Sequence, residues 1–259
     1  MMRWSDMCQE DAVVVNVEAR DVLLTDLEAR LRAAQGFSVA TLNLDHVTKL
    51  RSLPSFRKAY QRQTHVTADG NPIVWFSRIA GQQVSLVPGS ELVDPLAGIA
   101  ARCGVPIALL GSTESSLEAA AQSLRRRYPD LQVAARIAPQ MGFDPTGPEA
   151  EEHIEALAAS GAGLCFLALG APKQEIFAAH AAQQLPQMGF VSIGAGLDFI
   201  SGQQVRAPRL VRALAAEWLW RLASNPRRLA RRYGACIAIL PRLLHRSLRI
   251  RLKGGQKPV

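Results

Sequence analysis

The chain has 259 residues, of which 48% are hydrophobic and 20% are charged, and a formal net charge of +8. This length suits one large domain, or one domain with an appendage, and this composition excludes a disordered or fibrous protein. Fourteen of the Lys and Arg residues lie in 205–259 with one acid, Glu217, so this tail carries +13 and the rest of the chain −5. The basic tail indicates a surface that binds phosphates, of nucleic acid or of lipid.

Metal, redox and export signals are missing from the sequence. The four cysteines and five histidines are scattered, without the spacing of a zinc site, a redox pair or a disulfide framework. Asp6, Glu10 and Asp11 stand where the apolar run of a signal peptide would lie. The most apolar short run, 235–240, ends at Pro241 and cannot span a bilayer. We therefore expect a cytoplasmic protein, soluble or peripheral to a membrane.

Apolar runs typical of strands alternate with helical patterns over the first 200 residues. In chain order we predict a strand at 12–17, a helix at 21–34, a strand at 37–43, a polar helix at 44–62, a strand at 65–67, a helix opening at Pro72 and a helix at 91–102. There follow a strand at 105–110, a helix at 114–128, a strand at 131–137, a helix at 149–160, a strand at 163–169, a helix at 173–185 and a strand at 190–193. Buried strands separated by helices pair in parallel, which predicts a doubly wound, Rossmann-like α/β fold with a mostly parallel sheet.

The pattern after residue 204 contains helices only. The segments 208–223 and 226–252 each begin at a proline, and Pro241 is expected to kink the second. Arginines are interleaved in this second segment with apolar residues at three- and four-residue spacing: Leu229, Tyr233, Ile237, Leu240 and Leu244. We predict an α/β catalytic core, 1–204, and a basic amphipathic appendage, 205–259. The plain alternative is that the apolar stripe packs on the core and the arginines are solvated.

Three predicted strand ends carry residues suited to a phosphorylated ligand. In doubly wound sheets ligands bind beyond the carboxyl ends of the strands, against helix N-termini. The candidates are Gly111-Ser112-Thr113, Gly170-Ala171-Pro172-Lys173-Gln174-Glu175 and Gly194-Ala195-Gly196-Leu197-Asp198. Each turn alone could be no more than a helix cap. Neither a G-x-G-x-x-G nor a P-loop motif is present, which disfavours a dinucleotide dehydrogenase or a P-loop NTPase.

Asp69 is the carboxylate that the pattern singles out, because it follows a predicted strand. It also precedes Gly70, and Asp-Gly is a strong turn signal, so the pattern alone favours a turn aspartate over a catalytic one.

Several motifs in one order resemble a known family. They are Thr41-Leu42-Asn43, Thr67-Ala68-Asp69-Gly70, Gly170 to Glu175, Gly196-Leu197-Asp198-Phe199, Arg206-Ala207-Pro208, Glu217-Trp218-Leu219-Trp220-Arg221 and Pro226-Arg227-Arg228. Together they resemble the bacterial WecG/TagA/CpsF glycosyltransferases, glycosyltransferase family 26, from about residue 12 to about residue 235.

The resemblance implies transfer of a sugar from a UDP-sugar to a saccharide on a polyprenyl diphosphate lipid, in cell-surface polysaccharide biosynthesis. It implies inversion at the anomeric carbon, no metal ion and no other cofactor. It also implies a donor sugar of the N-acetylmannosamine, N-acetylmannosaminuronic acid or glucuronic acid type. The implied residues are Asp69 as general base, Thr41 and Asn43 in the active-site pocket, Gln174 on the substrate, and Arg221, Arg228 and Arg231 on the donor diphosphate.

The chemistry is consistent with this assignment. Inverting transfer needs a base for the acceptor hydroxyl and a group that stabilises the departing UDP. No D-x-D triplet that could hold a metal is present, and arginine forks match phosphate geometry. One position departs from the family pattern: an expected arginine aligns with Leu86, which puts full activity or donor specificity in doubt and leaves Arg78 as a candidate substitute.

Two other functions stay open from the sequence. A relative with impaired catalysis could act as a scaffold, and the basic tail could bind nucleic acid, although it has few aromatic residues for stacking bases. We expect the tail to contact the anionic inner face of the cell membrane instead. The sequence leaves open whether the chain forms a homo-oligomer.

Overall fold

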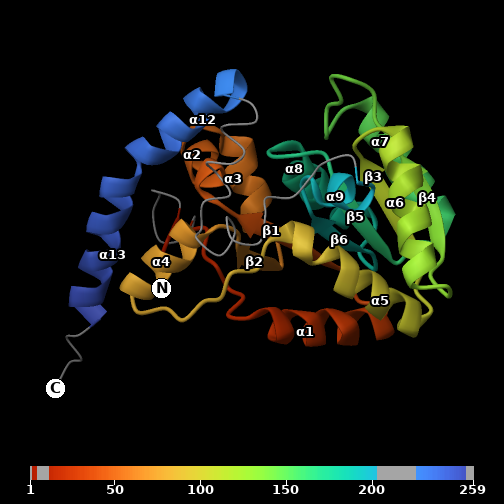
Figure 1. Cartoon of the computed structure of the whole chain (residues 1–259), viewed down its shortest axis with the longest axis horizontal. Coiled ribbons are helices and arrows are strands. Elements are labelled where there is room, and N and C mark those ends of the chain that lie inside the picture. The colour runs from red at the N-terminus through yellow and green to blue at the C-terminus, as the bar shows by residue number, and fades with distance from the viewer. Residues whose placement is uncertain (1, 5–11, 203–225, 255–259) are drawn as a thin grey trace.

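A six-stranded, entirely parallel sheet forms the centre of the computed structural model, which describes residues 2–4, 12–202 and 226–254 (Figure 1). The strand order is β2-β1-β6-β5-β3-β4. The strands are β1 (Phe37–Leu42), β2 (His65–Ala68), β3 (Ile107–Gly111), β4 (Val133–Ile137), β5 (Leu164–Ala168) and β6 (Gly189–Ser192). With helices on both faces, this confirms the predicted Rossmann-like α/β fold.

The helices surround the sheet and form most of the rest of the described chain (Figure 1). They are α1 (Arg20–Arg32), α2 (Leu44–Ser52), α3 (Pro54–Gln61), α4 (Asn71–Ile79), α5 (Val93–Cys103), α6 (Glu114–Arg127), α7 (Pro148–Ser160), α8 (Lys173–Gln184), α9 (Gly196–Ile200), α12 (Pro226–Ala238) and α13 (Leu240–Gly254), with a 3-10 turn η2 (Gly89–Glu91). The polar stretch predicted as one helix is two, because Pro54 starts a new helix and Leu53 before it is extended.

Side chains of the central strands alternate between two apolar cores. In β5, Phe166 packs with α1, α5 and α6 on one face of the sheet, whereas Cys165 and Leu167 pack with α7 and α8 on the other. Both faces are therefore covered, which is why β1, β3 and β6 are buried along their whole length. A third core lies under α2, α3 and α4 beside β2.

The predicted first strand, 12–17, is wrong: this segment is extended but forms no strand. Its alternate residues Val13, Val15 and Val17 are buried, as the pattern predicted. Its contact with β2 is mixed: the Val66 carbonyl oxygen accepts from the backbone N–H groups of Asn16 and Val17 at 3.2 and 3.3 Å, whereas the Val66 N–H donates to the side-chain Oδ1 of Asn16 at 2.7 Å. The amide group of Asn16 thus takes the place of a backbone partner at the sheet edge.

The two C-terminal helices pack on the core: α12 contacts α2, and α13 contacts α4 (Figure 1). Ile239 and Leu243 are buried in the third core. The expected kink at Pro241 is instead a break at Ile239, with Pro241 in the first turn of α13, where its missing N–H costs nothing. The predicted stripe is only partly used, since Ile237 and Leu244 remain exposed. The predicted helix 208–223 lies outside the described residues.

Candidate active site

The chain leaves neighbouring strands in different directions at the carboxyl edge between β1 and β6. After β1, helix α2 packs against α3 and α12, whereas after β6 helix α9 packs against α6 and η2 (Figure 1). Such a divergence is where open parallel sheets bind ligands. Of the predicted site residues at β1, β2, β5 and β6, Thr41 lies within the last residues of β1 and the others follow their strands at this edge.

Asp69 and Asn43 leave the ends of β2 and β1 side by side. The register pairs Leu42 with Ala68, and the Asp69 N–H donates to the Leu42 carbonyl oxygen at 2.8 Å. Asn43 caps α2, its Oδ1 accepting from the His46 N–H at 3.0 Å. The residue that caps α4 is Gly70 rather than Asp69, whose side chain is half-buried. The edge therefore places a carboxylate next to the β1 turn.

Thr41 is buried beneath this edge, close to Gly89 of η2. A Cβ added to Gly89 would lie 2.6 Å from the Ser192 carbonyl oxygen and 3.1 Å from the Thr41 methyl carbon. Glycine at this position therefore lets η2 sit directly on the ends of β1 and β6.

Gln174 joins the turn after β5 to the turn after β6. Its Oε1 accepts from the Gly194 N–H at 3.2 Å, and its Nε2 donates to the Glu175 Oε1 at 2.8 Å. Gln174 is 2% exposed, so both polar ends of its side chain are engaged inside the protein. Lys173 is half-buried one residue before it; hydrogen bonds from Thr146 and, more weakly, the charge of Lys173 lower the pKa of Asp144.

Asp198 and Gly111 have structural partners at the far side of the edge. The Asp198 Oδ1 accepts from the Ser112 hydroxyl at 2.6 Å and from the Ser116 hydroxyl at 2.9 Å, which ties α9 to the start of α6. Gly111 has a φ of +114°, and a Cβ there would lie 2.5 Å from the Ala168 backbone. These contacts give Asp198 and Gly111 a structural role that needs no bound ligand.

Gly196 begins α9 and is tightly packed, since an added Cβ would lie 3.1 Å from Val93 and 3.2 Å from Ile193. β3 is three strand spacings from β1, about 14 Å at the usual spacing. The predicted residues therefore fall into two groups, with Asp69, Asn43, Gln174 and Gly194 nearest the point where α2 and α9 diverge.

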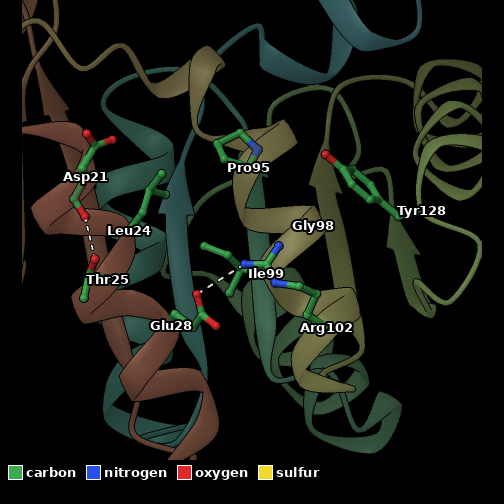
Figure 2. Close-up of a pocket in the computed structure, with 9 residues that line it drawn as sticks. All are labelled: Asp21, Leu24, Thr25, Glu28, Pro95, Gly98, Ile99, Arg102 and Tyr128. Atoms are coloured by element: carbon green, nitrogen blue, oxygen red, sulfur yellow. Dashed lines mark hydrogen bonds and ion pairs between the residues drawn. The ribbon is translucent and has the colours of Figure 1, made fainter.

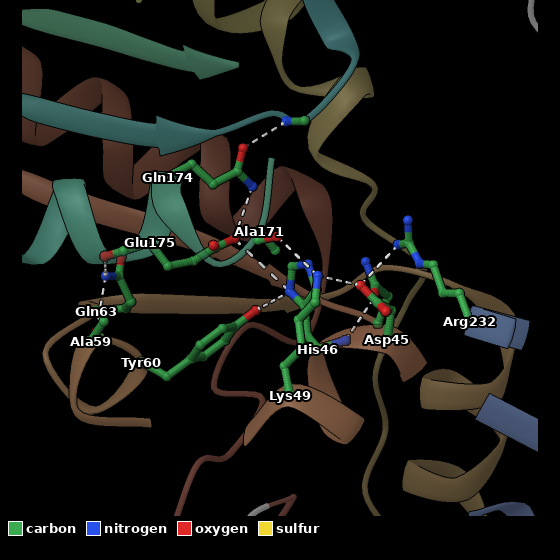
Figure 3. A network of polar contacts seen from close by, with 12 residues as sticks. Asp45, His46, Lys49, Ala59, Tyr60, Gln63, Ala171, Gln174, Glu175 and Arg232 are labelled. Carbon is green, nitrogen blue, oxygen red and sulfur yellow. Dashed lines mark hydrogen bonds and ion pairs between the residues drawn. The ribbon is translucent and has the colours of Figure 1, made fainter. Parts of the chain in front are cut away.

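A buried polar network below the edge was missed by sequence reasoning (Figure 3). Glu175 is fully buried on α8, and its Oε1 lies 3.9 Å from the His46 Nδ1. The same His46 nitrogen is 2.6 Å from the Tyr60 hydroxyl. The Gln63 Nε2 donates to the Glu175 carbonyl oxygen at 3.2 Å. The one available signal was Glu175 in the first turn of α8, because α2 and α3 carry no recognised motif.

Burial dominates the electrostatics of this network. It raises the pKa of Glu175 to about 7 and lowers the pKa of His46 to about 3. Burial, together with the negative charges of Glu175 and Asp69, raises the pKa of Tyr60 well above its usual value. His46 and Tyr60 are therefore neutral at physiological pH, and Tyr60 is close enough to the edge to experience the charge of Asp69.

Asp45 connects α12 to the same region (Figure 3). Its Oδ2 lies 2.8 Å from the Lys49 Nζ and 3.0 Å from the Arg232 guanidinium. The Lys49 Nζ also donates to the Ala171 carbonyl oxygen at 2.9 Å. The buried Asp45 carboxylate thus joins α12 to α2, and Lys49 links it to the turn that precedes Lys173.

The contacts described above do not show where the side chains of the predicted donor arginines lie. Arg221 lies outside the described residues, and so do the side chains of Arg228 and Arg231, whose backbone belongs to α12. Leu86 forms a parallel bridge with Ala68 and is 41% exposed, so the departing position is beside the predicted base.

Arg78 is in the last turn of α4, which begins two residues after Asp69. At the usual rise of 1.5 Å per residue, its backbone is about 10 Å farther along the helix than the first turn. Arg78 as the substitute for an arginine at position 86 stays a prediction.

A groove elsewhere in the described chain does not belong to this edge. The groove between α1 and α5 in Figure 2 contains none of the predicted site residues; it is lined by Asp21, Leu24, Thr25, Glu28, Pro95, Gly98, Ile99, Arg102 and Tyr128. Among the described residues, no group of three or more His, Cys, Asp and Glu side chains could hold a metal ion. In the same ranges no helix has the length and apolar character that crossing a membrane requires.

The family resemblance of the motifs is confirmed by a comparison with protein-family models. The model described as the glycosyl transferase WecG/TagA/CpsF family matches residues 12–257, which includes the sheet, the carboxyl edge and both C-terminal helices. The chain therefore belongs to the WecG/TagA/CpsF family of glycosyltransferases, which act in cell-surface polysaccharide biosynthesis.

Proposed function

We propose that this glycosyltransferase moves a sugar from a UDP-sugar to a saccharide on a polyprenyl diphosphate lipid, with inversion and with Asp69 as general base. The observation that carries the proposal is the half-buried Asp69 carboxylate beside Asn43, where the ends of β1 and β2 meet. A carboxylate at the carboxyl edge of a parallel sheet can reach the hydroxyl of a ligand bound there.

The reaction needs one proton transfer and one displacement. The acceptor hydroxyl gives its proton to Asp69 while its oxygen forms a bond to the anomeric carbon. The bond from that carbon to the UDP oxygen breaks on the opposite face, and UDP leaves with the electron pair. Single displacement from the opposite face inverts the anomeric centre.

Binding of the donor is assigned to the remaining residues of the edge and to the appendage. The turn with Lys173 supplies a cation, which suits phosphate oxygens, and the glycines of the turn from Gly194 to Gly196 let the backbone approach a bound donor closely. We assign the charge that develops on the departing diphosphate to Arg221, Arg228 and Arg231, because guanidinium groups stay charged and bind phosphate in a bidentate manner.

The test of this mechanism compares two aspartates. Purified protein is incubated with lipid-linked acceptor and UDP-N-acetylmannosamine, its uronic acid analogue or UDP-glucuronic acid, and UDP release is measured. Asp69→Asn is expected to lower kcat by about 100-fold or more, the usual contribution of a general base. Asp130→Asn, an exposed carboxylate next to the amino end of β4, is the matched control. Full activity of Asp69→Asn refutes the assignment. If the wild-type protein binds a donor but releases no UDP with any of the three, the scaffold alternative is favoured.

We further propose that α13 docks on an anionic membrane surface, which would bring the edge to a lipid-borne acceptor. Leu244, Leu248 and Leu252 recur every four residues and are 43%, 47% and 76% exposed, with Arg242 and Arg249 beside them. Each cation near such a surface adds about 1 kcal/mol. An exposed apolar stripe next to cations is typical of helices that lie in a membrane interface.

Vesicle flotation tests this contact. Binding to vesicles rich in phosphatidylglycerol is expected, with little binding to phosphatidylcholine, and Leu248→Asp is expected to abolish it. Val22→Asp, a change at an exposed residue of α1, is the control. Salt-sensitive DNA binding without vesicle binding would refute the proposal in favour of the nucleic-acid alternative.

A further inference from the structure

Glu175 is a buried carboxyl group for which the proposed reaction has no use. Its side chain is fully buried, and one oxygen, Oε2, has no hydrogen-bond partner among the described residues. The groups that face it are His46 from α2 and Tyr60 from α3, with the Asp45 and Lys49 charges farther out on α2 (Figure 3). Its direct side-chain hydrogen bond comes from the Gln174 Nε2 at 2.8 Å.

The two partners of Gln174 specify one orientation of its carboxamide. The Gly194 N–H can only donate, so it needs the Oε1 of Gln174 on its side. The Glu175 Oε1 accepts, so it needs the Nε2 on the other side. Rotating the amide by 180° would place two donors against each other at Gly194 and two acceptors against each other at Glu175.

The position of the Gly194 N–H group depends on its hydrogen bond to Gln174 more than that of a strand residue would. It follows the end of β6 with a φ of +55°, outside the ladder between β5 and β6. A side chain therefore holds its N–H group, and the orientation of that side chain decides where the turn lies.

We propose that Glu175 is a positioning residue, which fixes the carboxamide of Gln174 and through it the turn from Gly194 to Gly196. The effect on catalysis rests on the proposed function, in which this turn belongs to the donor site. The effect on the conformation of the turn does not depend on the proposed function. A carboxyl group accepts a hydrogen bond whether protonated or ionised, so the positioning persists across neutral pH, where burial places its pKa.

An exchange of the two side chains tests this geometry. Gln174→Glu alone sets two carboxyl groups against each other and is expected to release Gly194. The double variant Gln174→Glu/Glu175→Gln has the same composition as the wild type. In it residue 174 accepts from both Gly194 and the new amide, so the turn is expected to be held again.

Amide hydrogen exchange at Gly194 is the readout that needs no substrate. Relative to the wild type, Gln174→Glu and Glu175→Leu are expected to exchange about tenfold faster, the ratio for one lost hydrogen bond. Glu175→Gln and the double variant are expected to stay within about threefold of the wild type. Leu157→Ala, in the core under α7, is the control for a general loss of stability.

The outcomes separate the inference from the proposed reaction. Unchanged exchange at Gly194 in Gln174→Glu, or no recovery in the double variant, overturns the inference. In assays with a UDP-sugar, Glu175→Leu is expected to raise the KM about tenfold with a smaller change in kcat, and Glu175→Gln is expected to restore it. An equal loss in Glu175→Leu and Glu175→Gln would point to proton transfer by Glu175 and also overturn it. If no UDP-sugar is turned over but exchange behaves as expected, the proposed function fails and the positioning stands.

Discussion

Replacing Glu175 by Gln is expected to stabilise the folded protein at neutral and alkaline pH. Burial raises the pKa of this carboxyl group from 4.5 to about 7. At 1.36 kcal/mol per pKa unit, this shift corresponds to about 3 kcal/mol. Between these two pH values the folded state keeps a proton that the unfolded state has released, so stability falls as the pH rises through the window. Gln does not ionise, and the variant avoids this loss.

Urea denaturation followed by circular dichroism measures the effect. The unfolding free energies of the wild type and Glu175→Gln are compared at intervals from about pH 5 to about pH 8.5. Their difference is expected to grow with pH by roughly 2 to 3 kcal/mol and to level off above pH 8. Glu155→Gln, an exposed residue of α7, is expected to run parallel to the wild type.

A constant difference between Glu175→Gln and the wild type would refute the reasoning, because it would mean that the buried carboxyl group does not titrate in this window. A difference that shrinks with rising pH would mean that a cation stabilises the ionised form. Comparing the two proteins at each pH removes the contribution of all other titrating groups.

Two further predictions concern the covered end of the sheet. Gly89→Ala is expected to cost about 2 kcal/mol in urea denaturation, because its Cβ would lie 2.6 Å from the Ser192 carbonyl oxygen, and wild-type stability would contradict this packing. Leu86→Arg places a guanidinium next to the bridge with Ala68 and should lower the pKa of Asp69, so the acid limb of the pH profile of kcat/KM moves to lower pH. An unmoved limb would show that position 86 does not reach the base.

Local patterns in the sequence were sufficient for most of the fold. Six of the seven predicted strands form, because fully apolar runs such as 105–110 are stable only with both faces covered. The exception, 12–17, has the burial pattern of a strand, but the Val66 N–H of β2 donates to the side chain of Asn16 and not to a backbone carbonyl oxygen of this segment. Hydrophobic alternation indicates which residues are buried, but it does not indicate which groups form the hydrogen bonds of the backbone.

Sequence patterns predicted only part of the candidate site. Asp69, Asn43 and the turn at Gln174 could be predicted to lie at this edge because they follow strands and match family motifs. Asp45, His46 and Tyr60 carry no local signal, since nothing in α2 or α3 shows that α8 packs against them. The family model covers the appendage as well as the core, although position 86 departs from the family pattern.

Local patterns were enough to predict six strands, their parallel pairing, the turns at their ends and the basic character of the tail, since each depends on residues close together in the chain. Tertiary structure alone decided that Phe37 pairs with Gly189, which makes β1 and β6 neighbours. It also placed α12 on Asp45 and buried Glu175 beside a neutral histidine. Strand order and the pKa of a buried group depend on segments that meet only when the chain folds. The ion pair between Arg232 of the +13 tail and Asp45 of the −5 body depends on packing for the same reason.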